Sequence, residues 1–502
     1  MIGDNDRAMA NEIELKLALP ESARRALLRH PLLKTASAKR TEQLVNIYYD
    51  TPDLALRSRK IALRLRRQGN LWLQTVKCAG TATGGLSTRP EWETPYDGQF
   101  DFSPIDDAAV RAVLEKKRIR TRLIPAFETN FRRTTWHFDG VMLMLDRGWM
   151  AANGRHAAIS ELEIELAGGE VDALFRLAET LARRVPLLPA VLSKAERGYR
   201  LHSGAEAAPC KSCDIPLARN IAPLRAFRTI TLACLEHLQH NHAGAISTDN
   251  PEYIHQLRVA ARRLGGCLRL FGPLLPNDFT EQLSPPLRNM MALLGRARDL
   301  DVLVAEIVAP VLAAYAGDAD LVRLASRVDE HRQAARHAAV AYLQSREFGQ
   351  LMLRSAALLH QAPFIDSTDK TSAADYTAAR LQRMRRQVGR LLTLARPDDT
   401  ASLHALRIGI KRLRYALEFS APLAKRKTRQ RLALRLAAIQ GMLGQINDQA
   451  GAERQLIDCA GDDQDMHRAI ALIIDWQAPH RETMRQQLPE LLATIQRLPK
   501  VA

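Results

Sequence analysis

The sequence predicts an α+β domain built on an antiparallel β-barrel, followed by an all-α domain. Residues 11–202 contain eight segments that alternate in polarity or are rich in branched and aromatic residues, with Gly, Pro or Asp between them. Only two helical patterns, at 21–30 and 170–185, interrupt these segments. From about residue 218 the sequence becomes rich in Ala, Leu and Arg, with hardly a strand signal. Eight strands with few helices favour a closed or nearly closed barrel.

The same change in sequence character predicts the domain boundaries. We expect residues 9–203 to form the first domain, 204–217 to form a linker and 218–502 to form the second domain. A chain of 502 residues is longer than one ordinary hydrophobic core requires, which agrees with at least two domains.

Composition indicates a cytoplasmic protein with an anionic partner. The formal net charge is +17. The first ten residues are polar, and no apolar run reaches the roughly 18 residues of a membrane span. Six scattered cysteines fit a reducing compartment. Cys210 and Cys213 have CxxC spacing, and His237, His240 and His242 could complete a zinc site, but a polar linker is the favoured interpretation.

Charged residues share one face of several predicted strands. In the segment NEIELKLALP, Glu12, Glu14 and Lys16 alternate with apolar residues. The same alternation places the following residues on charged faces: Arg64, Arg66, Lys77, Arg89, Glu91, Glu93, Glu161, Glu163 and Glu165. On a single strand such a face usually contacts solvent. Because several strands carry ordered clusters of both signs, we favour a wide barrel whose charged faces point inward and whose apolar faces pack outward against helices.

A cavity lined by acids and bases suits a polyanion and its cations. Buried charges are costly unless they are paired or bound to a metal. Carboxylates without His or Cys are hard oxygen ligands that suit Mg²⁺ or Mn²⁺ better than zinc. Arg and Lys in the same cavity suit phosphate oxygens. These residues therefore predict a metal-dependent site for a phosphate chain.

The first domain resembles the CYTH domains, the triphosphate tunnel metalloenzymes. The segment EIELK resembles their ExExK signature. Further segments agree in order over residues 10–202: NIYYDTPDLAL, IALRLR, TVK, GGLSTRPEWE, LDRG, ELEIELAGG and LSKAERGY. The resemblance implies an eight-stranded tunnel that hydrolyses inorganic triphosphate or related substrates. Within this family, the sequence is most similar to bacterial inorganic triphosphatases in which a helical CHAD domain follows the tunnel domain.

The resemblance also implies roles for individual residues. The implied metal ligands are Glu12, Glu14, Glu161 and Glu163. The implied phosphate-binding residues are Lys16, Arg64, Arg66, Lys77, Arg133 and Lys194. The implied catalytic set is Glu12, Glu14, Lys16, Lys77, Glu91 and Asp146. Alternatives stay open: Arg132 in place of Arg133, Glu93 in place of Glu91, Glu165 at the tunnel mouth, and Lys194 on the surface.

The second domain contains an internal repeat at about 254–301 and 403–450. The segment IHQLRVAARRLGGCLRLF begins at Ile254, and LHALRIGIKRLRYALEFS begins at Leu403. His255 precedes Asp299 by the same interval that separates His404 from Asp448. In both copies His and basic residues fall on one helical face, with Leu, Ile and Phe opposite. The basic face is either solvated or a binding surface.

This repeat resembles the CHAD domain over about residues 218–495. The resemblance implies two four-helix bundles with a basic channel that binds inorganic polyphosphate. The implied polyphosphate-binding residues are His255, Arg258, Arg262, Arg263, His404, Arg407, Lys411, Arg412 and Arg414. Two departures affect the channel edge: GQIND replaces GRARD in the second copy, and Gly265 stands where Arg is expected. We expect Asp299, Asp301 and Asp448 to orient Arg side chains.

The leading hypothesis is metal-dependent hydrolysis of inorganic triphosphate in the tunnel, with Mg²⁺ or Mn²⁺, and polyphosphate binding by the helices. One alternative is a non-catalytic protein associated with polyphosphate granules. Another is an adenylate cyclase or organic triphosphatase that uses the same tunnel. Nucleic-acid binding is disfavoured, because aromatic residues make up only 5% of the chain and are absent from the basic faces.

Overall fold

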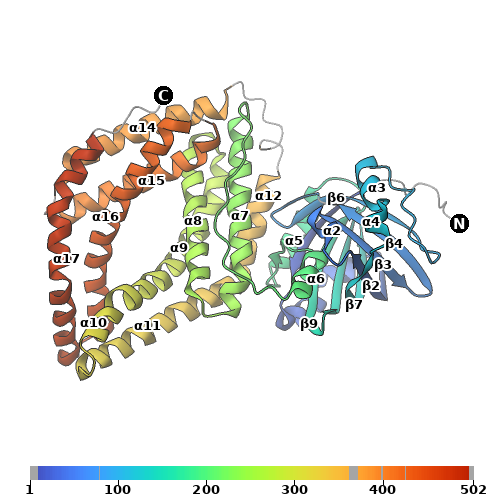
Figure 1. Cartoon of the computed structure of the whole chain (residues 1–502), viewed down its shortest axis with the longest axis horizontal. Helices are drawn as coiled ribbons and strands as arrows, with labels where there is room; N and C mark the ends of the chain where they lie inside the picture. The colour runs from blue at the N-terminus through green and yellow to red at the C-terminus, as the bar shows by residue number, and fades with distance from the viewer. Residues whose placement is uncertain are drawn as a thin grey trace. The chain divides into compact units, whose positions relative to one another are not determined.

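The computed structural model describes residues 10–78, 80–360, 364, 371–396, 399–423 and 426–496 (Figure 1). The chain divides into two compact units. The first unit contains the described residues up to Ala208 together with Gln344–His360, and the second contains Pro209–Leu343 and the described residues after Gln361.

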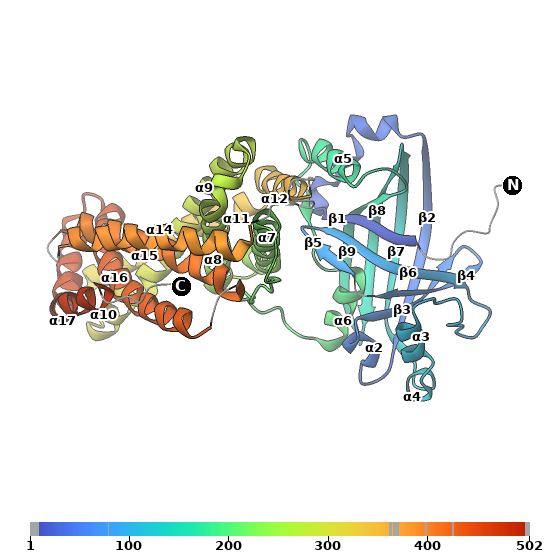
Figure 2. The same ribbon diagram turned by 90° about the horizontal axis from the view of Figure 1, so that it is seen from above.

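Eight strands of the first unit close into an antiparallel barrel, which can be followed in Figure 2. The hydrogen-bonded order is β1–β9–β8–β7–β2–β3–β4–β6, and β6 pairs back onto β1. The barrel strands are β1 (Ala10–Ala18), β2 (Ala38–Asp50), β3 (Ile61–Gln68), β4 (Leu71–Cys78), β6 (Leu86–Pro95), β7 (Ile124–Phe138), β8 (Val141–Ala152) and β9 (Arg155–Leu166). Short strands β5 (Thr81–Thr83) and β10 (Leu188–Pro189) pair with β6 and β1. The closed barrel confirms the predicted fold class.

The apolar faces of the strands pack outward against helices. Leu15 and Leu162 share one core with Phe175 of α5 (Asp172–Ala182). Leu63 shares a second core with Leu114 of α3. The helices of this second core are α2 (Ala55–Ser58), α3 (Ala108–Leu114) and α4 (Lys117–Arg120), which the two predicted helical segments did not include. Because side chains alternate along a strand, the outward packing of the apolar residues turns their charged neighbours into the barrel.

Helix α12 (Arg346–Leu359) lies within the predicted second domain in sequence, yet it packs in the first unit. Leu353 and Ala356 of α12 belong to the same core as β1, β9 and α5. Arg354 pairs with Glu179 of α5 at 3.1 Å. The outer wall of the barrel is therefore completed by a helix from far along the chain.

The second unit contains, in the described part of the chain, two sets of four long helices that correspond in order (Figure 1). The sets are α7 (Pro223–Ser247), α8 (Pro251–Phe271), α9 (Asn277–Val302) and α11 (Ala319–Leu343), and then α14 (Ala373–Leu394), α15 (Thr400–Ser420), α16 (Arg426–Ala460) and α17 (Gln464–Gln496). Helices α8 and α15 are both 21 residues long, and each runs into a 3-10 turn of 3 residues. The all-α fold class of this region is confirmed. Within the described residues, no helix has the length and apolarity that a bilayer span requires.

Candidate active site in the barrel

A polar cavity of about 390 Å³ lies inside the barrel. The charged side chains that line it are Glu12, Glu14, Lys16, Arg64, Arg66, Lys77, Arg89, Glu91, Glu93, Arg133, Glu163, Glu165 and Lys194. These residues come from β1, β3, β4, β6, β7 and β9, and Lys194 from the start of α6 (Lys194–Ser203). The predicted inward orientation of the charged faces is confirmed.

An acidic cluster lies at one part of this site. Carboxylate oxygens of Asp146, Glu161 and Glu163 lie within 4.8 Å of one another, and all three residues are buried. Strand register explains their proximity, because Arg133, Asp146 and Glu161 are directly opposite one another on β7, β8 and β9. The cluster is therefore fixed by the barrel's backbone and not by a loop.

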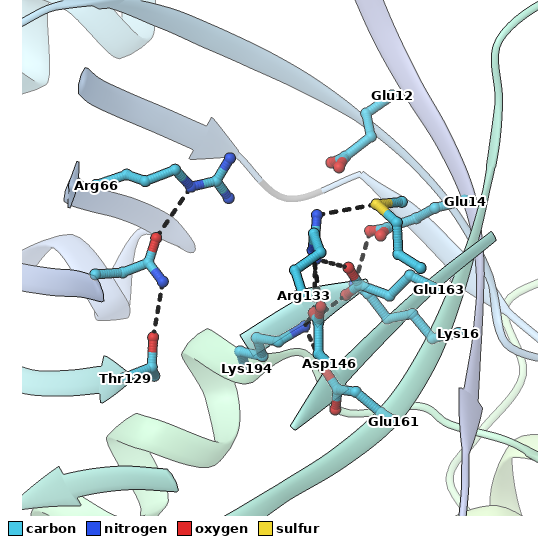
Figure 3. A network of polar contacts seen from close by, with 12 residues as sticks. Glu12, Glu14, Lys16, Arg66, Thr129, Arg133, Asp146, Glu161, Glu163 and Lys194 are labelled. Carbon is cyan, nitrogen blue, oxygen red and sulfur yellow. Dashed lines mark hydrogen bonds and ion pairs between the residues drawn. The ribbon is translucent and has the colours of Figure 1, made fainter. Parts of the chain in front are cut away.

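Arg133 and Lys194 neutralise the acidic cluster (Figure 3). Arg133 donates from Nε and Nη2 to the two oxygens of Asp146 at 2.7 and 2.6 Å, and from Nη2 to Glu163 at 2.6 Å. Lys194 Nζ lies 2.7 Å from Asp146 and 2.9 Å from Glu163, and it also pairs with Glu161. Asp146 is fully buried, so these partners offset a large desolvation cost.

The two acids of the ExExK segment have partners of their own. Arg89 donates to Glu12 at 3.0 Å and to Glu14 at 2.6 Å. Lys77 lies 2.7 Å from Glu12, and Lys16 lies 2.7 Å from Glu14. Glu12 and Glu14 thus pair with bases other than Arg133 and Lys194, which pair with the Asp146 cluster.

Two arginines of β3 form the basic wall of the cavity. Arg64 lies 3.3 Å from Glu91 and 3.9 Å from Glu93, and Arg66 lies 3.6 Å from Glu93. Arg66 also donates to Asn46, whose amide donates in turn to Thr129 (Figure 3). This wall offers guanidinium groups in defined orientations, as recognition of phosphate oxygens requires.

Local charges shift the pKa values of several cavity residues. Burial alone would raise the pKa of Glu163, but Lys194, Arg133 and Lys16 lower it well below the usual range. Burial would also raise the pKa of Glu12, but the nearby Lys77 and Arg89 lower it below its usual range. Glu165 behaves differently, because burial and the neighbouring Glu12 raise its pKa to about 7. Burial and Arg64 lower the pKa of Arg66 to about 10.

The structure distinguishes some of the open alternatives. Arg133 lines the cavity, whereas Arg132 is exposed on the outer face of β7. Glu91, Glu93 and Glu165 all line the cavity. Lys194 is only 7% exposed and is ion-paired inside the barrel. The functional roles of these residues stay predictions.

Arg89 was predicted to lie on a charged strand face, with no role of its own. The structure gives it one of the central positions, because its guanidinium bridges Glu12 and Glu14. The β1–β6 register explains this position, since Glu12 lies directly opposite Arg89. The alternation of charges along β6 signalled that Arg89 faces inward, but the closure of β6 onto β1 was not visible in the sequence.

The donor set of the acidic cluster fits a divalent cation. Asp146, Glu161 and Glu163 supply only carboxylate oxygens, the ligands that Mg²⁺ and Mn²⁺ prefer. Glu161 and Glu163 belong to the predicted ligand set, whereas Asp146 was assigned a different role. Glu12 and Glu14, the other predicted ligands, line the cavity together with Glu163, whereas Asp146 and Glu161 are not among its lining residues.

In the helical unit, α8 and α15 carry the predicted polyphosphate-binding residues. Arg258 is ion-paired with Asp299 at 2.5 Å. Burial and the nearby Arg258 lower the pKa of Arg262. Arg263 is 3% exposed and lies 2.8 Å from Glu418, so it is committed to the contact between α8 and α15.

The sequence also led to predictions for three acids and one cysteine pair of this region. Asp299 pairs with Arg258, and Asp301 lies 3.8 Å from Arg332, which agrees with acids that orient Arg side chains. The side chain of Asp448 lies outside the described residues. Within the described part of the chain, Cys210 and Cys213 belong to no cluster of metal ligands.

Comparison with known proteins agrees with this division. The family model for the CYTH domain matches residues 10–199, and that for the CHAD domain matches residues 229–457. An inorganic triphosphatase from Haemophilus influenzae is 32% identical over 203 residues, which are 39% of this chain and 57% of that protein. The chain therefore spans little more than half the length of this relative. A CHAD domain structure from the plant Ricinus communis matches with a TM-score of 0.52 and 31% identity, over 59% of this chain and 99% of that one.

Proposed function

Because this chain carries a CYTH domain followed by a CHAD domain, we propose that its barrel hydrolyses inorganic triphosphate in a metal-dependent reaction. The observation that carries the proposal is the cavity itself, where buried carboxylates adjoin a wall of arginines and lysines. The similarity to an inorganic triphosphatase supports the same reaction class.

Each group in the cavity suits one requirement of phosphoryl transfer. Arg64, Arg66 and Arg133 can bind phosphate oxygens and stabilise the charge that develops on the equatorial and leaving oxygens. A divalent cation held by Asp146, Glu161 and Glu163 would offset phosphate charge and lower the pKa of a bound water. Hydrolysis uses water as the nucleophile, and a carboxylate of the cavity can accept its proton.

The paired network explains how the tunnel tolerates its charges. Cavity acids such as Glu14, Glu91 and Glu163 each form an ion pair with a nearby Lys or Arg. When triphosphate and its cation enter, the bases can re-pair with phosphate oxygens while the carboxylates re-pair with the cation. Binding therefore exchanges one set of ion pairs for another and leaves no buried charge without a partner.

Phosphate release tests this function. We expect the protein to release phosphate from tripolyphosphate faster than from ATP or long polyphosphate, with Mg²⁺ or Mn²⁺ present. Glu14→Gln should abolish the activity, because Glu14 is 1% exposed and central to the cavity. Glu115→Gln is the matched control, since Glu115 is an exposed residue at the end of α3. A faster reaction with ATP would favour the organic triphosphatase or cyclase alternative.

We also propose that the helical unit binds polyphosphate through the basic faces of α8 and α15. The cluster of His255, Arg258 and Arg262 supports this proposal. Burial and the nearby arginines lower the pKa of His255, and burial and Arg258 lower the pKa of Arg262, so a bound anion would offset the positive charge here. Retention on immobilised polyphosphate should weaken with salt. It should also weaken when His404 and Arg407 are both changed to Ala, but not when the matched pair His331 and Arg327 of α11 is changed. Equal retention of both double variants would place the anion site elsewhere.

A further inference from the structure

Two residues that end sequence motifs of the first unit, Asp50 and Tyr199, do not line the cavity. Asp50 ends the segment NIYYD on β2, and Tyr199 ends LSKAERGY on α6. The structure joins them, because the Tyr199 hydroxyl donates to Asp50 Oδ2 at 2.9 Å. Asp50 is fully buried and Tyr199 is 3% exposed.

Asp50 is a fixed anchor. Its carboxylate accepts from the backbone N–H groups of Thr51, Leu56 and Arg57 at 2.7, 2.8 and 2.9 Å. These bonds tie the end of β2 to the short helix α2. The hydroxyl of Tyr199 supplies the remaining contact of this buried carboxylate, so it connects α6 to a rigid part of the barrel.

Other residues of α6 also pack closely against the barrel. A Cβ atom on Gly198 would lie 2.1 Å from the ring of Phe127, so the helix backbone touches the ring of this β7 residue. Tyr199 packs edge-on against the same ring, with centroids 5.0 Å apart. At the start of the helix, Ser193 and Glu196 form a capping box.

Helix α6 presents Lys194 to the acidic cluster. Lys194 is the first residue of the helix, one turn and a half before Tyr199. Its Nζ pairs with Asp146, Glu161 and Glu163, and such a three-way contact requires the helix axis to be held in place.

We propose that the Tyr199–Asp50 hydrogen bond is a positioning contact that holds α6 so that Lys194 reaches the acidic cluster and the phosphate chain. Tyr199 and Asp50 do not line the cavity, and they act through Lys194. This inference rests on the proposed triphosphatase function, which gives Lys194 its role.

A double-mutant cycle tests the proposal. The cycle compares the unchanged protein, Tyr199→Phe, Lys194→Ala and the protein with both changes, by kcat and KM for tripolyphosphate. We expect Tyr199→Phe to lower kcat/KM roughly 10-fold to 100-fold, since a displacement near 1 Å has effects of this order. In the Lys194→Ala background the same change should cost less than about 2-fold, because the side chain that it positions is gone.

A second measurement does not require turnover. Acetylation of Lys194, followed by mass spectrometry and normalised to the exposed Lys34 of the same chain, should accelerate several-fold in Tyr199→Phe and in Gly198→Ala. Tyr96→Phe is the control, because it removes a hydroxyl that donates to the carbonyl oxygen of Gly98 in an exposed turn. This control should change neither kcat/KM nor the acetylation of Lys194.

The outcomes separate this inference from the proposed function. If the unchanged protein does not hydrolyse tripolyphosphate, the function fails and the acetylation of Lys194 alone decides the positioning role. If it does hydrolyse tripolyphosphate, equal losses from Tyr199→Phe in both backgrounds, or an unchanged acetylation rate, overturn the positioning role.

Discussion

Arg133 and Asp146 lie directly opposite each other on β7 and β8, and the guanidinium binds both oxygens of the fully buried carboxylate. The pair adjoins Glu163 and Lys194 and so connects the acidic cluster to the basic side of the cavity. Its rigidity comes from two neighbouring strands, which gives the acidic cluster a geometry that is fixed before any ligand binds.

We expect Arg133→Lys to lower phosphate release from tripolyphosphate at least about tenfold. Lysine keeps the charge but cannot donate two parallel bonds to Asp146, so the carboxylate loses part of its fixed orientation. Steady-state kinetics of the purified variant measure the effect. The control is Arg132→Lys, since Arg132 is the neighbouring residue on the outer face and should leave the kinetics unchanged. Equal effects of the two changes would contradict the assigned role of Arg133.

Removal of divalent cations should stop the reaction. After EDTA treatment and dialysis we expect no phosphate release, and Mg²⁺ or Mn²⁺ should restore it, because the acidic cluster offers hard oxygen ligands. Glu163→Gln should raise the cation concentration required for half-maximal activity, whereas the exposed Glu115→Gln should not. Full activity in EDTA would refute the metal dependence.

The thiol of Cys78 should react slowly and with a steep dependence on pH. Burial raises its pKa to about 11, so below that pH the reactive thiolate is a small fraction that grows about tenfold for each pH unit. Alkylation by iodoacetamide, followed by mass spectrometry from pH 7 to pH 10, should show this slope. The exposed Cys213 provides the internal control for the reagent. A plateau in the rate for Cys78 near pH 8.5 would contradict the raised pKa of this half-buried thiol.

Gly349→Ala should destabilise the barrel unit. A Cβ atom at this position of α12 would lie 2.2 Å from the carbonyl oxygen of Leu187, a backbone atom that cannot move alone. Gly389→Ala in α14 is the matched control, because nothing lies within 4 Å of its Cβ position. This control should be neutral or stabilise its helix by about 0.5–1 kcal/mol. Thermal denaturation of both variants measures the difference, and a smaller or equal loss for Gly349→Ala would show that α12 does not dock here.

The sequence revealed those parts of the site that depend on local periodicity. Glu12, Glu14 and Lys16 alternate with leucine and isoleucine, and this period of two correctly predicted which residues face the cavity. The bridge from Arg89 to Glu12 and Glu14 depends on how β6 closes onto β1, which no local pattern encodes.

Long-range packing was equally hidden. The sequence of helix α12 has the same character as that of the neighbouring helices. In the folded structure, Leu353 and Ala356 pack in the core of the barrel unit, which shows that α12 belongs to it. The contact between Asp50 and Tyr199 joins two segments that the sequence separates widely. In both cases the contact forms only through the tertiary structure, and no periodic pattern in the sequence identifies which segments will meet.

The path of the backbone has a genetic consequence. The chain leaves the barrel unit at Ala208, returns to it at Gln344 and leaves again after His360. A recombination event that cut this gene once, between its two family regions, would separate α12 from the barrel. The apolar side chains of the barrel unit that pack against α12 would then be exposed. A barrel region expressed without residues 344–360 is therefore expected to expose this apolar surface to solvent, which would favour aggregation.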